Sequence, residues 1–173
     1  MNVAVVQPIA GVSVNRETDI EAVYPSIASG FLGQLIGMIM GAVSAAIPVT
    51  FIRVIVLVAV GAALLPLGLL AYALNKIFGV CYIVTNRSVQ KRSFLGNSMT
   101  AQVALTDIDH IEIASGAGYK FHRVGDLNLV GAQGNLLLTI EAIQFPERLK
   151  HVILDARQAR QLSDRSLAQI QSR

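Results

Sequence analysis

The chain carries two long runs without any Asp, Glu, Lys, Arg or His, at residues 22–52 and 54–75, and only Arg53 separates them. A helix that crosses a bilayer needs about 20 apolar residues, and each run is long enough to supply them. We therefore predict two membrane-spanning helices, at about 27–47 and 54–74. Pro48 lacks a backbone donor and marks the end of the first helix, so the short turn predicts an antiparallel transmembrane hairpin.

After the second run the pattern changes to short stretches in which apolar and polar residues alternate, separated by turn residues such as Gly and Asn. This alternation is typical of antiparallel strands with one buried face. The sequence predicts about seven strands, at 80–85, 87–93, 100–105, 110–114, 120–124, 127–130 and 136–142.

The period changes once more near the C-terminus. Pro146 suits the first turn of a helix, where a missing backbone donor costs nothing. Leu149, Val152, Ile153 and Ala156 then follow the i, i+3, i+4, i+7 spacing of one helix face. The predicted fold is therefore a membrane protein with a two-helix transmembrane hairpin and a mostly-β domain, whose antiparallel strands are capped by a C-terminal α-helix.

These patterns divide the chain into four parts. Residues 1–26 are expected to form an N-terminal surface segment, mostly extended. Two interpretations of this segment stay open, a short interfacial helix near 17–24 or a partly ordered tail. The hairpin occupies residues 27–79 and the β domain residues 80–160. A C-terminal tail follows at 161–173.

Residues 82–89 read Tyr-Ile-Val-Thr-Asn-Arg-Ser-Val. They resemble the pattern Tyr-x-hydrophobic-Thr-Asn-Arg that opens the domain of the bacterial PH-like domain membrane protein family, in which a pair of membrane helices often precedes the domain. Residues 104–108, 124–127 and 145–146 are also similar to that family. The resemblance implies a pleckstrin-homology-like (PH-like) fold and membrane association, but no reaction and no shared catalytic or ligand-binding residue. Side-chain bonds from Thr85 and Asn86 to the backbone explain the motif as a turn.

A stripe of small residues follows one face of the first predicted helix. Its members recur every four residues: Ser29, Gly33, Gly37, Gly41 and Ala45. Small side chains let another helix approach closely, which is how many membrane helices associate. The stripe either receives the second helix of the same hairpin, which is also rich in Ala and Gly, or packs against a helix of an integral membrane partner. Both uses can hold at once.

Basic residues follow the second predicted span closely: Lys76, Arg87, Lys91 and Arg92. The tip of the hairpin offers only Arg53. Because positive charge is retained on the cytoplasmic side, both termini are expected there, in a multi-pass protein of the bacterial cytoplasmic (inner) membrane. The same four residues are candidate contacts for anionic lipid headgroups.

No constellation predicts an active site. Asp109 is expected on the strand face opposite His110 and Glu112, so these residues are interpreted, with Asp107, as solvated edge residues. Neither predicted span offers a ligand for haem, chlorophyll or a metal, and the single cysteine, Cys81, excludes an internal disulfide. With a formal charge of only +3, nucleic-acid binding is not expected either. The sequence therefore predicts no enzyme and no cofactor.

The remaining functions are non-catalytic. The sequence favours an accessory or scaffolding subunit that packs its hairpin against a larger membrane complex and covers the cytoplasmic face of that complex. An energy-transducing assembly, respiratory or photosynthetic, is one candidate host. The alternative is a free-standing sensor of anionic lipid or peptide at the cytoplasmic membrane surface.

Overall fold

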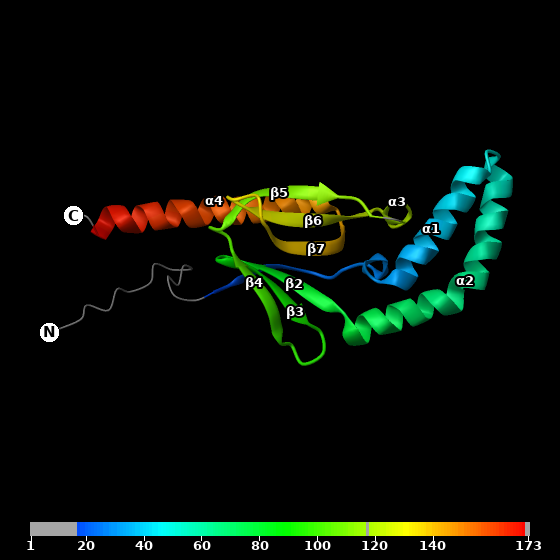
Figure 1. The fold of residues 1–173 in the computed structure, drawn as a ribbon, viewed down its shortest axis with the longest axis horizontal. Coiled ribbons are helices and arrows are strands. Elements are labelled where there is room, and N and C mark those ends of the chain that lie inside the picture. Colours follow the sequence, from blue (N-terminus) through cyan, green and yellow to red (C-terminus); the bar gives the residue numbers. More distant parts are fainter. Residues whose placement is uncertain (1–16, 117, 172–173) are drawn as a thin grey trace.

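The computed structural model describes residues 17–116 and 118–171, whose arrangement is drawn in Figure 1. The strands in these residues are β1 (Asp19–Val23), β2 (Val80–Thr85), β3 (Ser88–Ser93), β4 (Met99–Ala104), β5 (Ile108–Ala114), β6 (Val124–Gly131) and β7 (Leu136–Gln144). The helices are α1 (Phe31–Ala46), α2 (Thr50–Phe78), α3 (Tyr119–His122) and α4 (Pro146–Gln171), and a short 3-10 turn, η1 (Ile27–Ser29), precedes α1.

The strands form two antiparallel sheets, one in the order β1-β2-β3-β4 and the other in the order β5-β6-β7. Side chains from both sheets meet in one core, which includes the fully buried Tyr82, Leu127 and Ile140. Helix α4 covers this core with Leu149 and Ile153. Burying a large aliphatic side chain contributes roughly 1.5–3 kcal/mol, so this stripe holds the helix on the sheets. The prediction of a mostly-β domain with a C-terminal helix is confirmed.

The observed set of strands differs from the predicted set in two places. The predicted strand at 120–124 is wrong, because α3 occupies most of that stretch. Gly118 and Arg123 lie on either side of α3 with φ angles of 76° and 54°, and this left-handed backbone ends extended structure. The additional strand is β1, which pairs with β2 from within the segment predicted to lie outside the domain. A helix near 17–24 is therefore wrong, while the extended backbone is confirmed for the described residues.

The C-terminal helix is longer than predicted. Residues 161–173 are expected as a tail, but α4 continues to Gln171. Figure 1 shows its last turns projecting beyond both sheets. Leu162 in this part is exposed, which agrees with a helix end that does not pack on the core.

The two apolar runs form a helical hairpin, but only one of its helices meets the length of a membrane span. Helix α2 has 29 residues, whereas α1 has 16. At 1.5 Å per residue α1 is about 24 Å long, short of a hydrocarbon layer of about 30 Å. Two membrane-spanning helices are therefore not confirmed. Pro66 lies within α2, and Figure 1 shows that this helix bends along its length. A proline causes such a bend because it lacks a backbone hydrogen-bond donor and its ring clashes with the preceding turn.

Candidate functional site at the junction of the hairpin and the sheets

Helix α1 is attached to the β domain through α3. A Cβ atom added to Gly37 would lie 2.6 Å from the carbonyl oxygen of Gly118 and 2.8 Å from the His122 ring. The His122 Nε2 atom lies 3.0 Å from the carbonyl oxygen of Gly33. A Cβ atom on Gly33 would collide with the backbone of Ile27. Glycine at position 37 therefore allows the backbone of α1 to approach α3, and glycine at position 33 allows η1 to fold back against the start of α1.

The stripe of small residues is divided by this contact. Gly33 and Gly37 are buried against η1 and α3, so the prediction that they receive α2 or a partner helix is replaced by packing on the chain's own domain. The other half of the stripe is open, since a Cβ atom added to Gly41 would meet no other atom within 4 Å and Ala45 is exposed. Ser29 lies apart from both halves, in the wall of a pocket.

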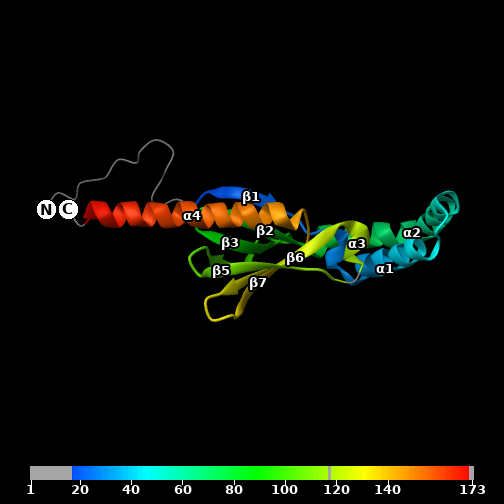
Figure 2. The same cartoon turned by 90° about the horizontal axis from the view of Figure 1, so that it is seen from above.

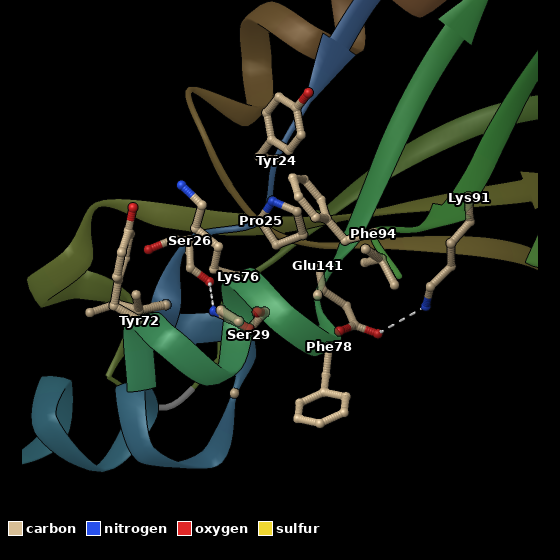
Figure 3. Close-up of a pocket in the computed structure, with 15 residues that line it drawn as sticks. Tyr24, Pro25, Ser26, Ser29, Tyr72, Lys76, Phe78, Lys91, Phe94 and Glu141 are labelled. Atoms are coloured by element: carbon tan, nitrogen blue, oxygen red, sulfur yellow. Dashed lines mark hydrogen bonds and ion pairs between the residues drawn. The ribbon is translucent and has the colours of Figure 1, made fainter. Parts of the chain in front are cut away.

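That pocket, here called the junction pocket, lies between the hairpin base and the first sheet and has a volume of about 550 Å³. Its walls come from the connection at residues 24–30, from the end of α2 and from β3 and β7. Figure 3 shows two lysines at opposite ends of it, Lys76 from α2 and Lys91 from β3. The structure thus brings together two of the four basic residues that the sequence singled out.

Within the described part of the chain, neither lysine forms a short ion pair with a carboxylate. The Lys91 ammonium lies 3.8 Å from the Glu141 carboxylate and 5.6 Å from the centre of the Tyr82 ring. The Lys76 ammonium lies 5.9 Å from the centre of the Tyr72 ring. Burial raises the pKa of the Tyr82 hydroxyl, so this ring stays neutral beneath Lys91. The pocket therefore combines two cations with one carboxylate and several aromatic rings.

The other two basic residues lie elsewhere. Along β3, alternate side chains point to opposite faces, so Arg92 faces away from Lys91. Its guanidinium donates two hydrogen bonds to Gln90 Oε1, at 3.0 and 2.6 Å. Arg87 lies in the turn before β3, at the other end of the strand. The predicted set of four lipid contacts is therefore split into a pair in the junction pocket and a pair outside it.

The sequence did not predict a polar cluster that lies on the face of β3 that carries Arg92. Thr85, Ser88 and Gln90 are nearly inaccessible, and all three donate hydrogen bonds to one oxygen of the Glu17 carboxylate. We call these three residues the carboxylate socket. The hydrogen bonds from Ser88 and Thr85 hold the pKa of Glu17 below its usual value. Every second residue of β3 on this face is polar, namely Ser88, Gln90 and Arg92. This pattern was the signal in the sequence from which a buried polar cluster could have been predicted.

The socket also explains the motif at residues 85–87. The Thr85 hydroxyl accepts hydrogen bonds from the backbone N–H groups of Arg87 and Ser88, which confirms the predicted turn role of Thr85. The Asn86 side chain instead accepts a hydrogen bond from the backbone of Thr18, in a segment distant along the chain. The motif thus stabilises the turn and also fastens the segment before β1.

The acidic residues around His110 lie closer together than predicted. The two ring nitrogens of His110 lie 3.1 Å from Asp109 Oδ2 and 3.3 Å from Glu112 Oε1. A register shift between Ile108 and His110 breaks the strict alternation, so the predicted separation of these side chains is wrong. The carboxylates raise the pKa of His110, chiefly through the hydrogen bond to Asp109. All three side chains are exposed, and the described residues contain no group of three that could hold a metal ion.

A family model described as bacterial PH domain matches residues 27–170 of the chain. The match covers well over half of the sequence and confirms the resemblance carried by residues 82–89. It includes the hairpin as well as the sheets, with the junction pocket between them, and it begins after β1. No curated protein and no solved structure matches the chain.

Proposed function

Because this chain belongs to the bacterial PH domain family, we propose that it is a membrane-anchored, non-catalytic accessory protein. In this role the hairpin inserts into the membrane and packs against an integral membrane partner. The PH-like domain then lies against the cytoplasmic side of that partner, with both termini in the cytoplasm.

The observation that carries the proposal is the bare apolar surface of α2. In its most apolar stretch of 18 residues only 6% are buried within the chain. Phe51, Val58 and Leu69 expose more than half of their surface. Soluble monomers rarely expose contiguous apolar surface on this scale, so a lipid or protein environment is the natural cover.

The attachment of α1 to α3 supports an anchoring role for the hairpin. Gly37 and Gly118 approach too closely for any larger residue, and His122 adds a polar contact to Gly33. A hairpin fixed in this way holds the domain at a set position above the membrane. A flexible tether would leave the orientation of the domain free.

The open half of the small-residue stripe is where a partner helix would pack. Gly41 on α1 and Gly68 on α2 have free space around them, and Ala45 is exposed. Within a bilayer, helices associate through close van der Waals contact, since lipid tails are as apolar as the side chains. Small residues on an exposed face favour such contact.

The test compares the full chain with two variants during purification in a mild detergent. Gly41→Leu fills the open half of the stripe, and Ala42→Leu adds a similar volume at the neighbouring exposed position. We expect a stoichiometric membrane protein to accompany the wild type and Ala42→Leu, and to be lost from Gly41→Leu at unchanged abundance. A wild-type protein that purifies alone would contradict the accessory role and favour the lipid-sensor alternative.

A further inference from the structure

We propose that the carboxylate socket and the neighbouring edge of β2 form a binding site for an extended, acidic segment of a different protein. In this arrangement a carboxylate of the partner replaces Glu17 in the socket, and the backbone of the partner pairs with β2 in place of β1. The chain's own residues 17–23 occupy the site until a partner displaces them. The inference goes beyond the accessory role proposed above, because it assigns a ligand site to the PH-like domain and does not depend on membrane insertion.

The donors of the socket are oriented by hydrogen bonds that do not involve Glu17. The Arg92 guanidinium donates two hydrogen bonds to Gln90 Oε1, and the Gln90 amide nitrogen on the other side donates to the carboxylate at 2.9 Å. The Gln102 amide donates to Ser88 Oγ at 2.9 Å, which leaves the Ser88 hydroxyl proton to donate to the carboxylate. Donors held in place in this way bind a charged acceptor strongly, since little order is lost on binding. The socket therefore suits a carboxylate, whichever chain supplies it.

Strand β1 contributes few side chains to the core. Asp19 and Ile20 are exposed, and Val23 packs against the core but is itself only partly buried. The Glu21 carboxylate pairs with Arg148, whose side chain is 73% exposed, and such a pair contributes little. Main-chain pairing with β2 and the contacts of the socket therefore provide most of the attachment of β1. An extended segment of another protein can supply both, as in other cases where a peptide adds a strand to a sheet.

The charges at this edge of the sheet favour an acidic segment. Residues 17–21, which fill the site here, contain three acidic side chains and no basic one. Besides the hydrogen bonds from the socket, the charge of Arg87 also lowers the pKa of Glu17, so this guanidinium attracts a carboxylate bound there. The family model includes all donors of the socket but begins at residue 27, after Glu17 and β1. The matched region therefore contains the site but not the segment that fills it.

A different protein is a better occupant than a second copy of this chain. Exchange of residues 17–23 between two copies replaces every contact by an identical one, while association costs the freedom of two separate chains. A different protein can make contacts that β1 lacks. Ala22 lies opposite Ile83 and is exposed, so a β-branched residue at this position of the partner gains a cross-strand contact.

The experiment measures binding of labelled peptides to the purified full chain in a neutral detergent by fluorescence anisotropy. The parent peptide is residues 17–24 with an acylated N-terminus and an amidated C-terminus. Two peptide variants, Glu17→Gln and Asp19→Asn, each lose one negative charge, so they differ only in its position. The proteins are the wild type, Glu17→Ala, which empties the socket, and Glu17→Ala combined with either Ser88→Ala or the exposed control Ser98→Ala.

We expect the parent peptide to bind Glu17→Ala, and to bind the wild type about tenfold more weakly, because the tethered Glu17 competes at high effective concentration. The Glu17→Gln peptide should lose about tenfold in affinity and the Asp19→Asn peptide no more than about twofold. Adding Ser88→Ala to the protein should weaken binding about fivefold, whereas adding Ser98→Ala should not change it. If Glu17→Ala does not fold, Glu17→Gln replaces it, since the amide oxygen still accepts hydrogen bonds.

Absence of peptide binding, equal losses for the two charge variants of the peptide, or an unaffected Ser88→Ala protein would each overturn the inference. The choice of partner is tested separately. A peptide with Ala22→Ile should bind about threefold more tightly than the parent, and the wild-type chain should be a monomer by light scattering in the same detergent. A wild-type dimer that Glu17→Ala dissociates would show that a second copy fills the site and would overturn the choice of a different protein.

Discussion

The carboxylate of Glu17 accepts a hydrogen bond of 2.7 Å from the hydroxyl of Thr85, which lies 68 positions later in the chain. Backbone hydrogen bonds join the same two regions, since Asn86 N–H donates to the Thr18 carbonyl oxygen at 3.1 Å. Strand β1 follows directly and pairs with β2. This contact therefore sets where the N-terminal segment joins the first sheet. Strand β1 lies at the edge of the first sheet, and Figure 2 shows it running alongside α4, to which Glu21 is joined by its ion pair with Arg148.

Removing the Glu17 carboxylate should destabilise the protein. In Glu17→Ala the inaccessible Thr85, Ser88 and Gln90 lose a common acceptor, and an unsatisfied buried polar group costs about 1–3 kcal/mol. We expect a loss of about 2 kcal/mol in the free energy of unfolding, measured in detergent with urea. Glu21→Ala serves as the control, because its ion pair with the exposed Arg148 is expected to contribute less than about 1 kcal/mol. Equal losses in the two variants would contradict a special role of the carboxylate socket.

The contribution of Glu17 should depend on pH. Its pKa is lowered in the folded state from the usual 4.5, because Ser88 and Thr85 donate hydrogen bonds to the charged form. The stabilisation is therefore fully present above pH 4.5 and is lost as the pH falls through the lower folded-state pKa. The difference in melting temperature between the wild type and Glu17→Ala should be constant from neutral pH to about 5.5 and shrink below about 4.5. A difference that widens on acidification would refute this assignment.

Two leucine substitutions on one stripe should give opposite results. Gly37→Leu places a side chain where Gly118 and His122 already lie, and overpacking of this kind costs about 1–3 kcal/mol or more. We expect poor accumulation in membranes, measured by immunoblot. Gly41→Leu enters open space and should accumulate normally. Leu35→Ala, which removes volume at a partly buried position, should also accumulate. Normal levels of Gly37→Leu would mean that the contact between α1 and α3 is dispensable.

The sequence predicted the elements whose periodicity is strong and local. The stripe formed by Leu149, Ile153 and Ala156 identified α4, and the alternation in residues 80–85 identified β2. Strand β1 was missed as part of the sheet because it depends on pairing with a strand about sixty residues later, which no local pattern records. The helix α3 was missed because its four residues are too few for a periodic signal.

The candidate site was predicted only in part, for a related reason. Positive charge near the end of α2 pointed to Lys76 and Lys91, but sequence spacing alone did not separate them from Arg87 and Arg92. That separation follows from the alternation of β3 and from the pairing of Arg92 with Gln90. Likewise, the fourfold spacing of the small residues was correct as a helix face. The spacing could not show that α3 covers half of that face, because this contact joins segments that are distant along the chain.

The position of the hairpin tip can be tested by cysteine labelling in intact cells. After replacement of Cys81 with Ala, a cysteine is placed at Thr50 near the tip, or at Ser166 on α4. We expect an impermeant reagent to label the tip only, because Arg53 favours an aqueous or headgroup environment and thinning of the bilayer accommodates the short α1. Labelling at Ser166 would contradict cytoplasmic termini. A protected tip would mean that the hairpin enters the membrane without crossing it.

The most direct test of the account is extraction of isolated membranes that contain the full chain. One sample is washed with high salt, a second with alkaline carbonate and a third with a mild detergent, and the protein is measured in the pellet and the supernatant. Because the exposed apolar surface of α2 is proposed to lie in hydrocarbon, the protein should stay in the pellet after salt and carbonate and be released only by detergent. Release by salt or carbonate would contradict membrane anchoring.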